Sequence, residues 1–306
     1  MTKQMKCLIF GLLIALISMG HSWATDFKVA VRAHNGLEIA IKTWQPTFDY
    51  LSQKLAPHTF TIVPIISLDE ISVRTGNAEF DFVLTNPSSY VEIEKLHGAY
   101  ALTTLNNKRA NTAQSRFGSV IFTHGRNTDI VSLHDLENKS LMVVSKPAFG
   151  GWRVAWLEML EQGFDPIEKL KELKFTKSRT QQEVVQAVLD GKVDAGVVRT
   201  DLLERLEAAN KIDMRYLRII NNKDIREFPF FLSTKLYPEW AVAALNHISS
   251  AQAKEVADVL LSISKDNVAA KKGKYIGWIA PKDYSVVAGL MKRLEVGPYA
   301  LKDVIK

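Results

Sequence analysis

Cysteine is almost absent from this sequence of 306 residues. The one cysteine, Cys7, stands before an apolar run near the N-terminus, so export with loss of that segment would leave no thiol. This excludes disulfides, thiolate catalysis and cysteine metal sites from the exported chain. The seven histidines are scattered without the spacing of metal ligands. We expect neither a metal nor another cofactor.

Common catalytic motifs are missing as well. The sequence has no HExxH, GxSxG or P-loop pattern. Ser88 and Ser89 have no activating base near them in the sequence, although the partners of a serine nucleophile can be distant along the chain. We therefore expect a protein that is not an enzyme.

Blocks of like charge are also missing. The net charge is +6, and it falls to +4 if Lys3 and Lys6 are lost with an N-terminal segment that carries no acid. Without basic–aromatic interleaving, this mild excess argues against nucleic acid as a partner. It suits a small anionic ligand.

One apolar run stands out, and it is short. Leu8 to Met19 follows two lysines and precedes Ser22-Trp23-Ala24, a small-x-small pattern. The run is shorter than the roughly twenty residues that cross a bilayer. We expect residues 1–24 to be a signal peptide, cleaved after Ala24, that exports the chain to the periplasm. An uncleaved anchor is the alternative.

The most informative stretch lies between Phe80 and Tyr90. Its first half is typical of a buried strand, after which Asn86 and Pro87 favour the start of a helix. The backbone amides of Ser88, Ser89 and Tyr90 would then be unpaired at a helix N-terminus, a place that holds anions. The alternative is a capped helix with ordinary serines.

A similar pattern occurs twice. A glycine that ends a helix, an acidic residue, a strand and a capped helix occur from Gly76 through Asp81, and again from Gly191 through Asp194 to Thr200 or Asp201. This pattern predicts two α/β lobes with helix N-termini at a shared cleft. We also expect a loop over 106–116, a strand over 228–234 and a helix over 240–248.

The sequence resembles the phosphonate/phosphate-type periplasmic solute-binding proteins, and most of all their variants in the sensor regions of tetrathionate-responsive histidine kinases. The resemblance covers the whole chain after the signal segment and rests on the order of several motifs. These are Trp44-Gln45-Pro46-Thr47, Asp81 to Tyr90, Phe117-Gly118-Ser119-Val120-Ile121-Phe122, Phe149-Gly150-Gly151, Gly191 to Thr200 and Tyr237-Pro238-Glu239-Trp240.

The resemblance implies a two-lobed, type II-like periplasmic binding protein fold with two crossovers between the lobes. We expect 25–122 and 224–306 to form lobe 1 and 123–223 to form lobe 2. Family ligand positions, with the helix-opening residues beside them, give a candidate ligand-binding set. The set is Asn86, Ser88, Ser89, Tyr90, Phe149, Gly150, Gly151, Thr180, Gln181, Arg199 and Thr200.

Several residues inside and outside this set leave alternatives open. Arg199 is either the counter-charge of the ligand or one half of an ion pair between the lobes, and Arg32 and Arg153 are weaker candidates of the same kind. Trp44 is either core filler or a ligand contact. Many relatives have a histidine where Gln181 stands, so phosphonate specificity does not carry over.

The function expected is capture of a small oxyanion, phosphonate-like or phosphate-like or a sulfur oxyanion, for the membrane permease of an ABC-type transporter. The alternative is a signalling receptor whose ligand-closed form engages a membrane histidine kinase. Because the sequence ends at Lys306 without a kinase domain, a stand-alone receptor is expected in either case.

Overall fold

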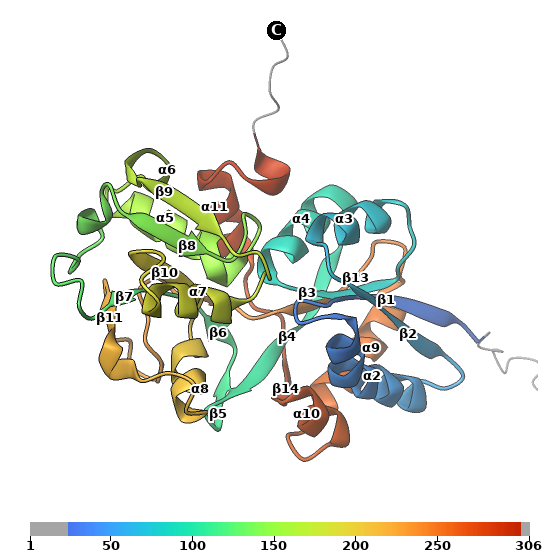
Figure 1. The fold of residues 1–306 in the computed structure, drawn as a ribbon. Coiled ribbons are helices and arrows are strands. Elements are labelled where there is room, and N and C mark those ends of the chain that lie inside the picture. The colour runs from blue at the N-terminus through green and yellow to red at the C-terminus, as the bar shows by residue number, and fades with distance from the viewer. Residues whose placement is uncertain (1–23, 301–306) are drawn as a thin grey trace, which may run out of the picture.

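The computed structural model describes residues 24–300, which form two α/β halves side by side (Figure 1). Of the expected signal peptide, residues 1–23 lie outside the described part. The first half contains a mixed sheet in the order β14-β4-β13-β3-β1-β2, with β5 paired to β4. Its strands are β1 (Asp26–Arg32), β2 (Thr59–Ile65), β3 (Phe82–Thr85), β4 (Tyr100–Arg109), β5 (Thr112–Gln114), β13 (Ala241–Ala244) and β14 (Tyr275–Ile279).

The second half contains a smaller mixed sheet in the order β11-β7-β10-β8-β9. Its strands are β7 (Ser119–His124), β8 (Ser140–Val143), β9 (Glu172–Phe175), β10 (Ala195–Arg199) and β11 (Leu217–Ile220). The lobe limits expected from the sequence remain a prediction. The limit between residues 122 and 123 passes through β7, and β7 pairs with β10 and β11.

The strand order repeats between the two sheets. β1 lies parallel between β2 and β3, with β13 antiparallel beside β3. In the same way β8 lies parallel between β9 and β10, with β7 antiparallel beside β10. Asp81 Oδ2 accepts the backbone N–H of Lys28 in β1, and Asp194 Oδ2 accepts that of Ser140 in β8, each at 2.7 Å. The sequence repeat is therefore confirmed as a structural one.

Helices pack against both sheets. Those associated with the first sheet are α2 (Leu37–Lys54), α3 (Leu68–Gly76), α4 (Pro87–His97), α9 (Ser250–Ser262) and α10 (Val268–Gly273). Those of the second half are the π-helical turn η2 (Phe149–Arg153), α5 (Val154–Glu161), α6 (Pro166–Lys169), α7 (Gln181–Leu189) and α8 (Leu202–Ala208). None of the helices described is long and apolar enough to cross a membrane.

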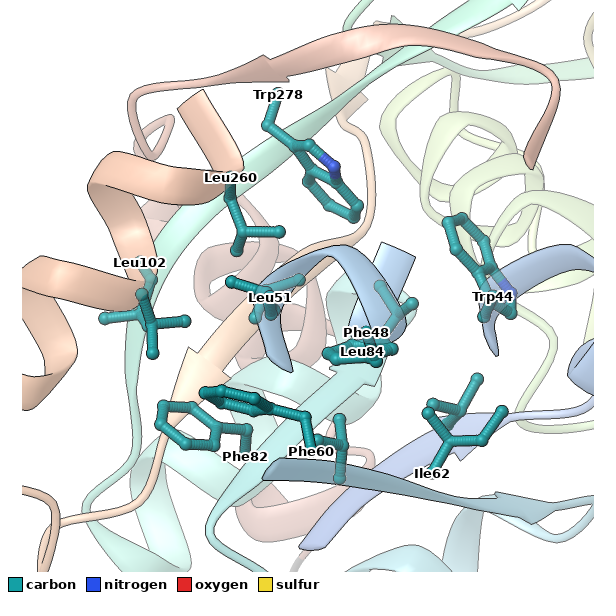
Figure 2. Packing of buried hydrophobic residues seen from close by; sticks show 14 of the residues in the cluster. Trp44, Phe48, Leu51, Phe60, Ile62, Phe82, Leu84, Leu102, Leu260 and Trp278 are labelled. Carbon is teal, nitrogen blue, oxygen red and sulfur yellow. The ribbon is translucent and has the colours of Figure 1, made fainter. Parts of the chain in front are cut away.

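The core of the first half forms between α2 and the sheet (Figure 2). Phe48 and Leu51 of α2 face Phe82 and Leu84 of β3, and all four side chains are buried. Trp44 is also buried and stacks on Tyr275 at a centroid distance of 6.1 Å. Each such apolar side chain contributes about 1.5–3 kcal/mol when it is buried. Trp44 is therefore a core residue, although it also borders a cavity described below.

The two halves are joined by two chain crossings, as the fold class predicts. The strands β6 (Arg116–Phe117) and β12 (Tyr237–Pro238) pair antiparallel between the sheets, so the crossings lie side by side. Helix α11 (Ser285–Arg293) contacts both α4 and α5 (Figure 1). The apolar cluster there contains Tyr90 and Val287 together with Phe149 and Leu157, so side chains of both halves share one core.

Three expected elements were wrong. Residues 106–109 continue β4, and β5 and β6 follow instead of the expected loop. Residues 241–244 form β13 instead of part of a helix, because this alanine-rich stretch lies buried between β3 and β4. Residues 228–234 have no strand pairing; Ser233 N–H donates to the Ser119 carbonyl at 2.9 Å beside β7.

Candidate functional site

A cavity of about 320 Å³ lies between the two halves. Its lining includes residues at the ends of parallel strands of both sheets. Arg32 ends β1, Asn86 follows β3, and Arg199 ends β10. Loops after the carboxyl ends of parallel strands are the usual ligand sites of open α/β sheets. The second half adds Ser145, the turn Phe149–Gly151, Arg179 and Gln181 to the lining.

Two arginines give this cavity its charge. Arg32 Nη1 donates to the carbonyls of Ile65, at 3.4 Å, and Ile66, which fixes its guanidinium at the end of β1. Arg179 faces the same cavity from the loop before α7, with a left-handed backbone (φ 56°). Burial and the charge of Arg179 lower the pKa of Arg32 to about 10, so Arg32 stays protonated at neutral pH. Within residues 24–300 neither arginine forms an ion pair.

Arg199 is neutralised inside the protein. Its Nη2 pairs with Oε1 of Glu239, which is fully buried and also accepts Asn107 Nδ2 at 2.8 Å. The guanidinium lies 4.0 Å from the ring centre of Phe117 in the first crossing. Burial opposes the charge of Arg199, but the attraction of Glu239 and Asp201 outweighs it and raises its pKa. Of the two alternatives for Arg199, the ion pair between the sheets is present.

The N-terminus of α4 is arranged differently from the expectation. Asn86 Oδ1 caps the helix by accepting Ser89 N–H at 3.1 Å and Ser88 Oγ–H at 3.0 Å. Tyr90 N–H donates to the Asn86 carbonyl at 2.9 Å. The amides of Ser89 and Tyr90 are therefore not unpaired, because the helix and its cap already use them.

The side chains that follow Asn86 in this segment do not line the cavity either. Ser88, Ser89 and Tyr90 are buried and are not among its lining residues. The Tyr90 hydroxyl donates to Glu94 at 2.5 Å and accepts Ala101 N–H at 3.1 Å. Burial and Glu94 raise the pKa of Tyr90, so the phenol is neutral. These residues therefore support the segment from which Asn86 lines the cavity.

The turn η2 brings backbone close to the cavity. Gly150 and Gly151 both line it, and a Cβ on Gly150 would lie 2.7 Å from Cε2 of Phe117. A Cβ on Gly151 would lie 2.6 Å from Cγ2 of Val144. Gly150 is also held by its carbonyl, which accepts Ser119 Oγ–H at 2.8 Å. The two glycines are required by packing, which lets the backbone itself form this side of the cavity.

Gln181 connects α7 to β10. Its Oε1 accepts Arg199 N–H at 2.6 Å, and the side chain lines the cavity. Thr180 precedes α7 and is exposed, but it is not a lining residue. Thr200 is buried, and its Oγ1 accepts Gly118 N–H at 3.2 Å across the first crossing.

The structure thus brings about half of the expected site residues together. Six of them line the cavity: Asn86, Phe149, Gly150, Gly151, Gln181 and Arg199. Five do not: Ser88, Ser89, Tyr90, Thr180 and Thr200. Sequence reasoning ranked Arg32 low and missed Arg179, His34 and Trp240, all of which line the cavity.

His34 and Trp240 form the middle of the cleft. Their rings lie 5.1 Å apart, edge to face; Trp240 is buried, and His34 lies within the cleft with part of its surface open to solvent. Enclosure by the protein and the charges of Arg32 and Arg199 lower the pKa of His34 below its ordinary value, so the ring is neutral at pH 7. Neutral donors and arginine forks together can bind a tetrahedral oxyanion.

Comparison with known families gives one match across most of the chain. The profile described as "ABC transporter, phosphonate, periplasmic substrate-binding protein" matches residues 36–285. The chain is also 28% identical over 279 residues to the tetrathionate sensor histidine kinase of Salmonella typhimurium. That match covers 90% of this chain but 45% of the kinase, so the chain spans less than half the length of this relative.

Several solved structures have folds similar to this chain. A Prochlorococcus marinus protein in complex with methylphosphonate superposes with a TM-score of 0.66 at 15% identity, covering 88% of this chain and 98% of the other. A binding protein component of a Pseudomonas aeruginosa ABC phosphonate transporter gives 0.65 at 14% identity, covering 92% and 91%. A Xanthomonas citri protein bound to ATP gives 0.68 at 16%, covering 88% and 98%. At these identities the likeness establishes the two-lobed fold.

Proposed function

Because the chain belongs to the phosphonate family of periplasmic substrate-binding proteins, we propose that it captures a small oxyanion in the cleft between its halves. The solute would be phosphonate-like, phosphate-like or a sulfur oxyanion. In the first candidate function the protein delivers this solute to the permease of an ABC-type transporter.

The observation that carries this proposal is the pair Arg32 and Arg179. Both line the cavity, and neither forms an ion pair among the described residues. A cationic guanidinium left without an acid in an enclosed space gains most from a negatively charged ligand. Asp69, at the border of the cavity, is the acidic residue of the lining, so cations outnumber acids there.

We propose that the solute contacts Arg32 and Arg179 together with Asn86, Gln181 and the backbone of the glycine turn. The remaining expected residues, including Ser88 and Thr200, would act indirectly, by holding the residues that line the cavity in place. Hydrogen bonds to a charged group contribute about 1.5–3 kcal/mol each. Four or five of them, less the cost of association, reach the roughly 8 kcal/mol of micromolar affinity.

A thermal-shift panel tests the proposal. Phosphate, methylphosphonate, sulfate, thiosulfate and tetrathionate are each added to the wild type, to Arg32→Gln and to Lys95→Gln, a control at an exposed lysine in α4. A ligand at a hundred times its Kd stabilises the fold by about 2.7 kcal/mol. We expect at least one anion to raise the Tm by several degrees in the wild type and the control but not in Arg32→Gln. If every anion leaves the Tm of the wild type unchanged, the proposal is wrong.

The periplasm is the proposed location, reached through cleavage after Ala24. Mass spectrometry of the protein from a periplasmic extract tests this, since the mature chain would begin at Thr25. An intact N-terminus in that fraction would contradict it.

The second candidate is signalling, in which the closed form engages a membrane histidine kinase. The similarity to the tetrathionate sensor kinase over 279 residues supports it. The genes beside this one separate the candidates: permease and ATPase genes favour transport, and kinase and response-regulator genes favour signalling.

A further inference from the structure

A second cavity, of about 300 Å³, continues the cleft. It shares its lining at Arg32, His34, Asn35, Gln181, Arg199 and Trp240 with the first cavity. From there it extends past Trp44 to the ends of β4, α8 and α10, where Arg109, Arg205 and Lys274 line it. The two cavities are therefore parts of one elongated space, and Arg179 belongs to the opposite end.

The far end of this space contains more positive than negative charge. Asp201 is buried, and it is the shared partner of Arg205 at 2.7 Å, Arg109 at 3.4 Å and Arg199 at 3.8 Å. Glu239 pairs with Arg199. Three guanidinium groups thus share two carboxylates, which leaves one positive charge in excess before Lys274 is added.

Two further features describe the charge at this end. The Nε atoms of Arg109 and Arg199 are buried and face Asp201, at 3.4 and 3.8 Å, without a hydrogen bond among the described residues. Lys274, which is exposed at the same cavity, forms no ion pair within the described part of the chain. Burial and the charge of Arg199 lower the pKa of Arg109, as expected for crowded cations. An anion bound beside the exposed cations Arg205 and Lys274 would offset this excess of positive charge.

The lining that the two cavities share contains two arginines, of which Arg199 is paired with Glu239. Apart from Arg32, the rest of the shared lining carries no charge: His34 is neutral, Asn35 and Gln181 are amides, and Trp240 presents an aromatic surface. Such a lining suits an uncharged or weakly polar connection between two charged groups.

We propose that the cleft selects elongated solutes with an anionic group at each end. One group would bind at Arg32 and Arg179, and the other at Arg109, Arg205 and Lys274. This inference rests on the proposed function and narrows its substrate class, because a compact oxyanion fills one end and leaves the other unpaired.

Two matched pairs of anions test it by isothermal titration calorimetry. Each pair has a compact and an elongated member: methylphosphonate with propane-1,3-diphosphonate, and thiosulfate with tetrathionate. In at least one pair we expect the elongated member to bind at least tenfold more tightly to the wild type.

A double variant separates the two ends. Arg205→Gln with Lys274→Asn removes two far-end charges, and asparagine tolerates the left-handed backbone of residue 274 (φ 55°). We expect this variant to lower the affinity for the elongated member at least fivefold and to change that for the compact member less than twofold. Arg32→Gln should weaken both members, and Lys95→Gln neither. The Tm of each ligand-free variant identifies any loss of folding.

The outcomes are distinct. Equal affinities within both pairs, or equal losses for both members in the double variant, would overturn the inference while leaving oxyanion capture intact. Failure of all four anions while phosphate or sulfate binds would overturn the inference alone, and failure of all six to bind the wild type would overturn the proposed function and the inference with it.

Discussion

Glu239 is the acidic side chain on which the charges of the cleft depend. It is fully buried, pairs with Arg199 and accepts a hydrogen bond from Asn107. Removing one member of a buried pair leaves the other charge without compensation, which costs about 3–5 kcal/mol. Because Arg199 keeps Asp201 at 3.8 Å, the lower part of that range applies.

We therefore expect Glu239→Gln to lower the free energy of unfolding by about 3 kcal/mol. Urea unfolding of the variant and of Glu161→Gln, which removes an exposed pair with Lys235, measures the difference. The control should change by less than about 1 kcal/mol. Equal losses of unfolding free energy in the two variants would mean that the buried pair stabilises the protein no more than the exposed pair does.

His34 links anion binding to pH. In the free cleft, enclosure and the charges of Arg32 on β1, Arg199 on β10, Arg109 on β4 and Arg205 on α8 lower its pKa. A bound anion offsets these charges and raises the pKa again, so binding takes up a proton and tightens as the pH falls through the raised value.

Calorimetry in buffers of different ionisation enthalpy at pH 6 measures this proton uptake. We expect greater uptake in the wild type than in His34→Gln, and the comparison removes any contribution from titration of the ligand itself. Identical uptake in the two proteins would show that His34 does not respond to the anion.

The cationic residues of the site were harder to predict from the sequence than its amide and glycine residues. Asn86, Gln181 and the glycine turn were found from helix starts and family motifs, because those signals are local. Arg179 was missed, since its place at the cleft depends on a left-handed loop residue that no sequence pattern marks as arginine.

At the scale of elements, the repeated aspartates hold parallel strands together. Asp194 precedes β10 and accepts both the N–H and the Oγ–H of Ser140 at the start of β8, at 2.7 and 2.6 Å. Partial burial works against the charged form of Asp194, but the Ser140 hydrogen bonds outweigh it and lower the pKa. Its stabilising contribution is therefore present above pH 4 and is lost as the pH falls through the lowered pKa.

Asp194→Ala should lower the free energy of unfolding by about 1–3 kcal/mol at pH 7. Asp190→Ala, which removes an exposed pair with Lys192, is the matched control and should change it by less than about 1 kcal/mol. Unfolding curves at pH 7 and pH 3 check the sign, since the difference between Asp194→Ala and the wild type should shrink at the lower pH. A difference that grows instead would contradict this account.

Elements with strong local signals were predictable, and those defined by distant contacts were not. Helix α4 begins at Pro87 after its Asn86 cap and ends before Gly98, as the sequence indicates. Alanine favours helices, yet Ala241–Ala244 form a central strand because β3 and β4 enclose them. The end of β4 is polar because Asn107 donates a hydrogen bond to the buried Glu239. This polarity is the reason why the sequence predicted a loop at the end of β4.

At the scale of the whole molecule, the duplicated strand order explains where the cleft lies. In both sheets the parallel strands end toward the cavity, so the loops of each half converge on it. The paired crossings β6 and β12, together with the core that α11 shares with α4 and α5, connect the two halves.

The central claim is that an oxyanion binds between the halves on arginine side chains. The most direct test is calorimetric titration of the anion that stabilises the protein most, with the wild type, Arg32→Gln, Arg179→Gln and the control Lys95→Gln. The account predicts a single site, at least tenfold weaker binding in each arginine variant and no change in the control. Wild-type affinity in both arginine variants would contradict it.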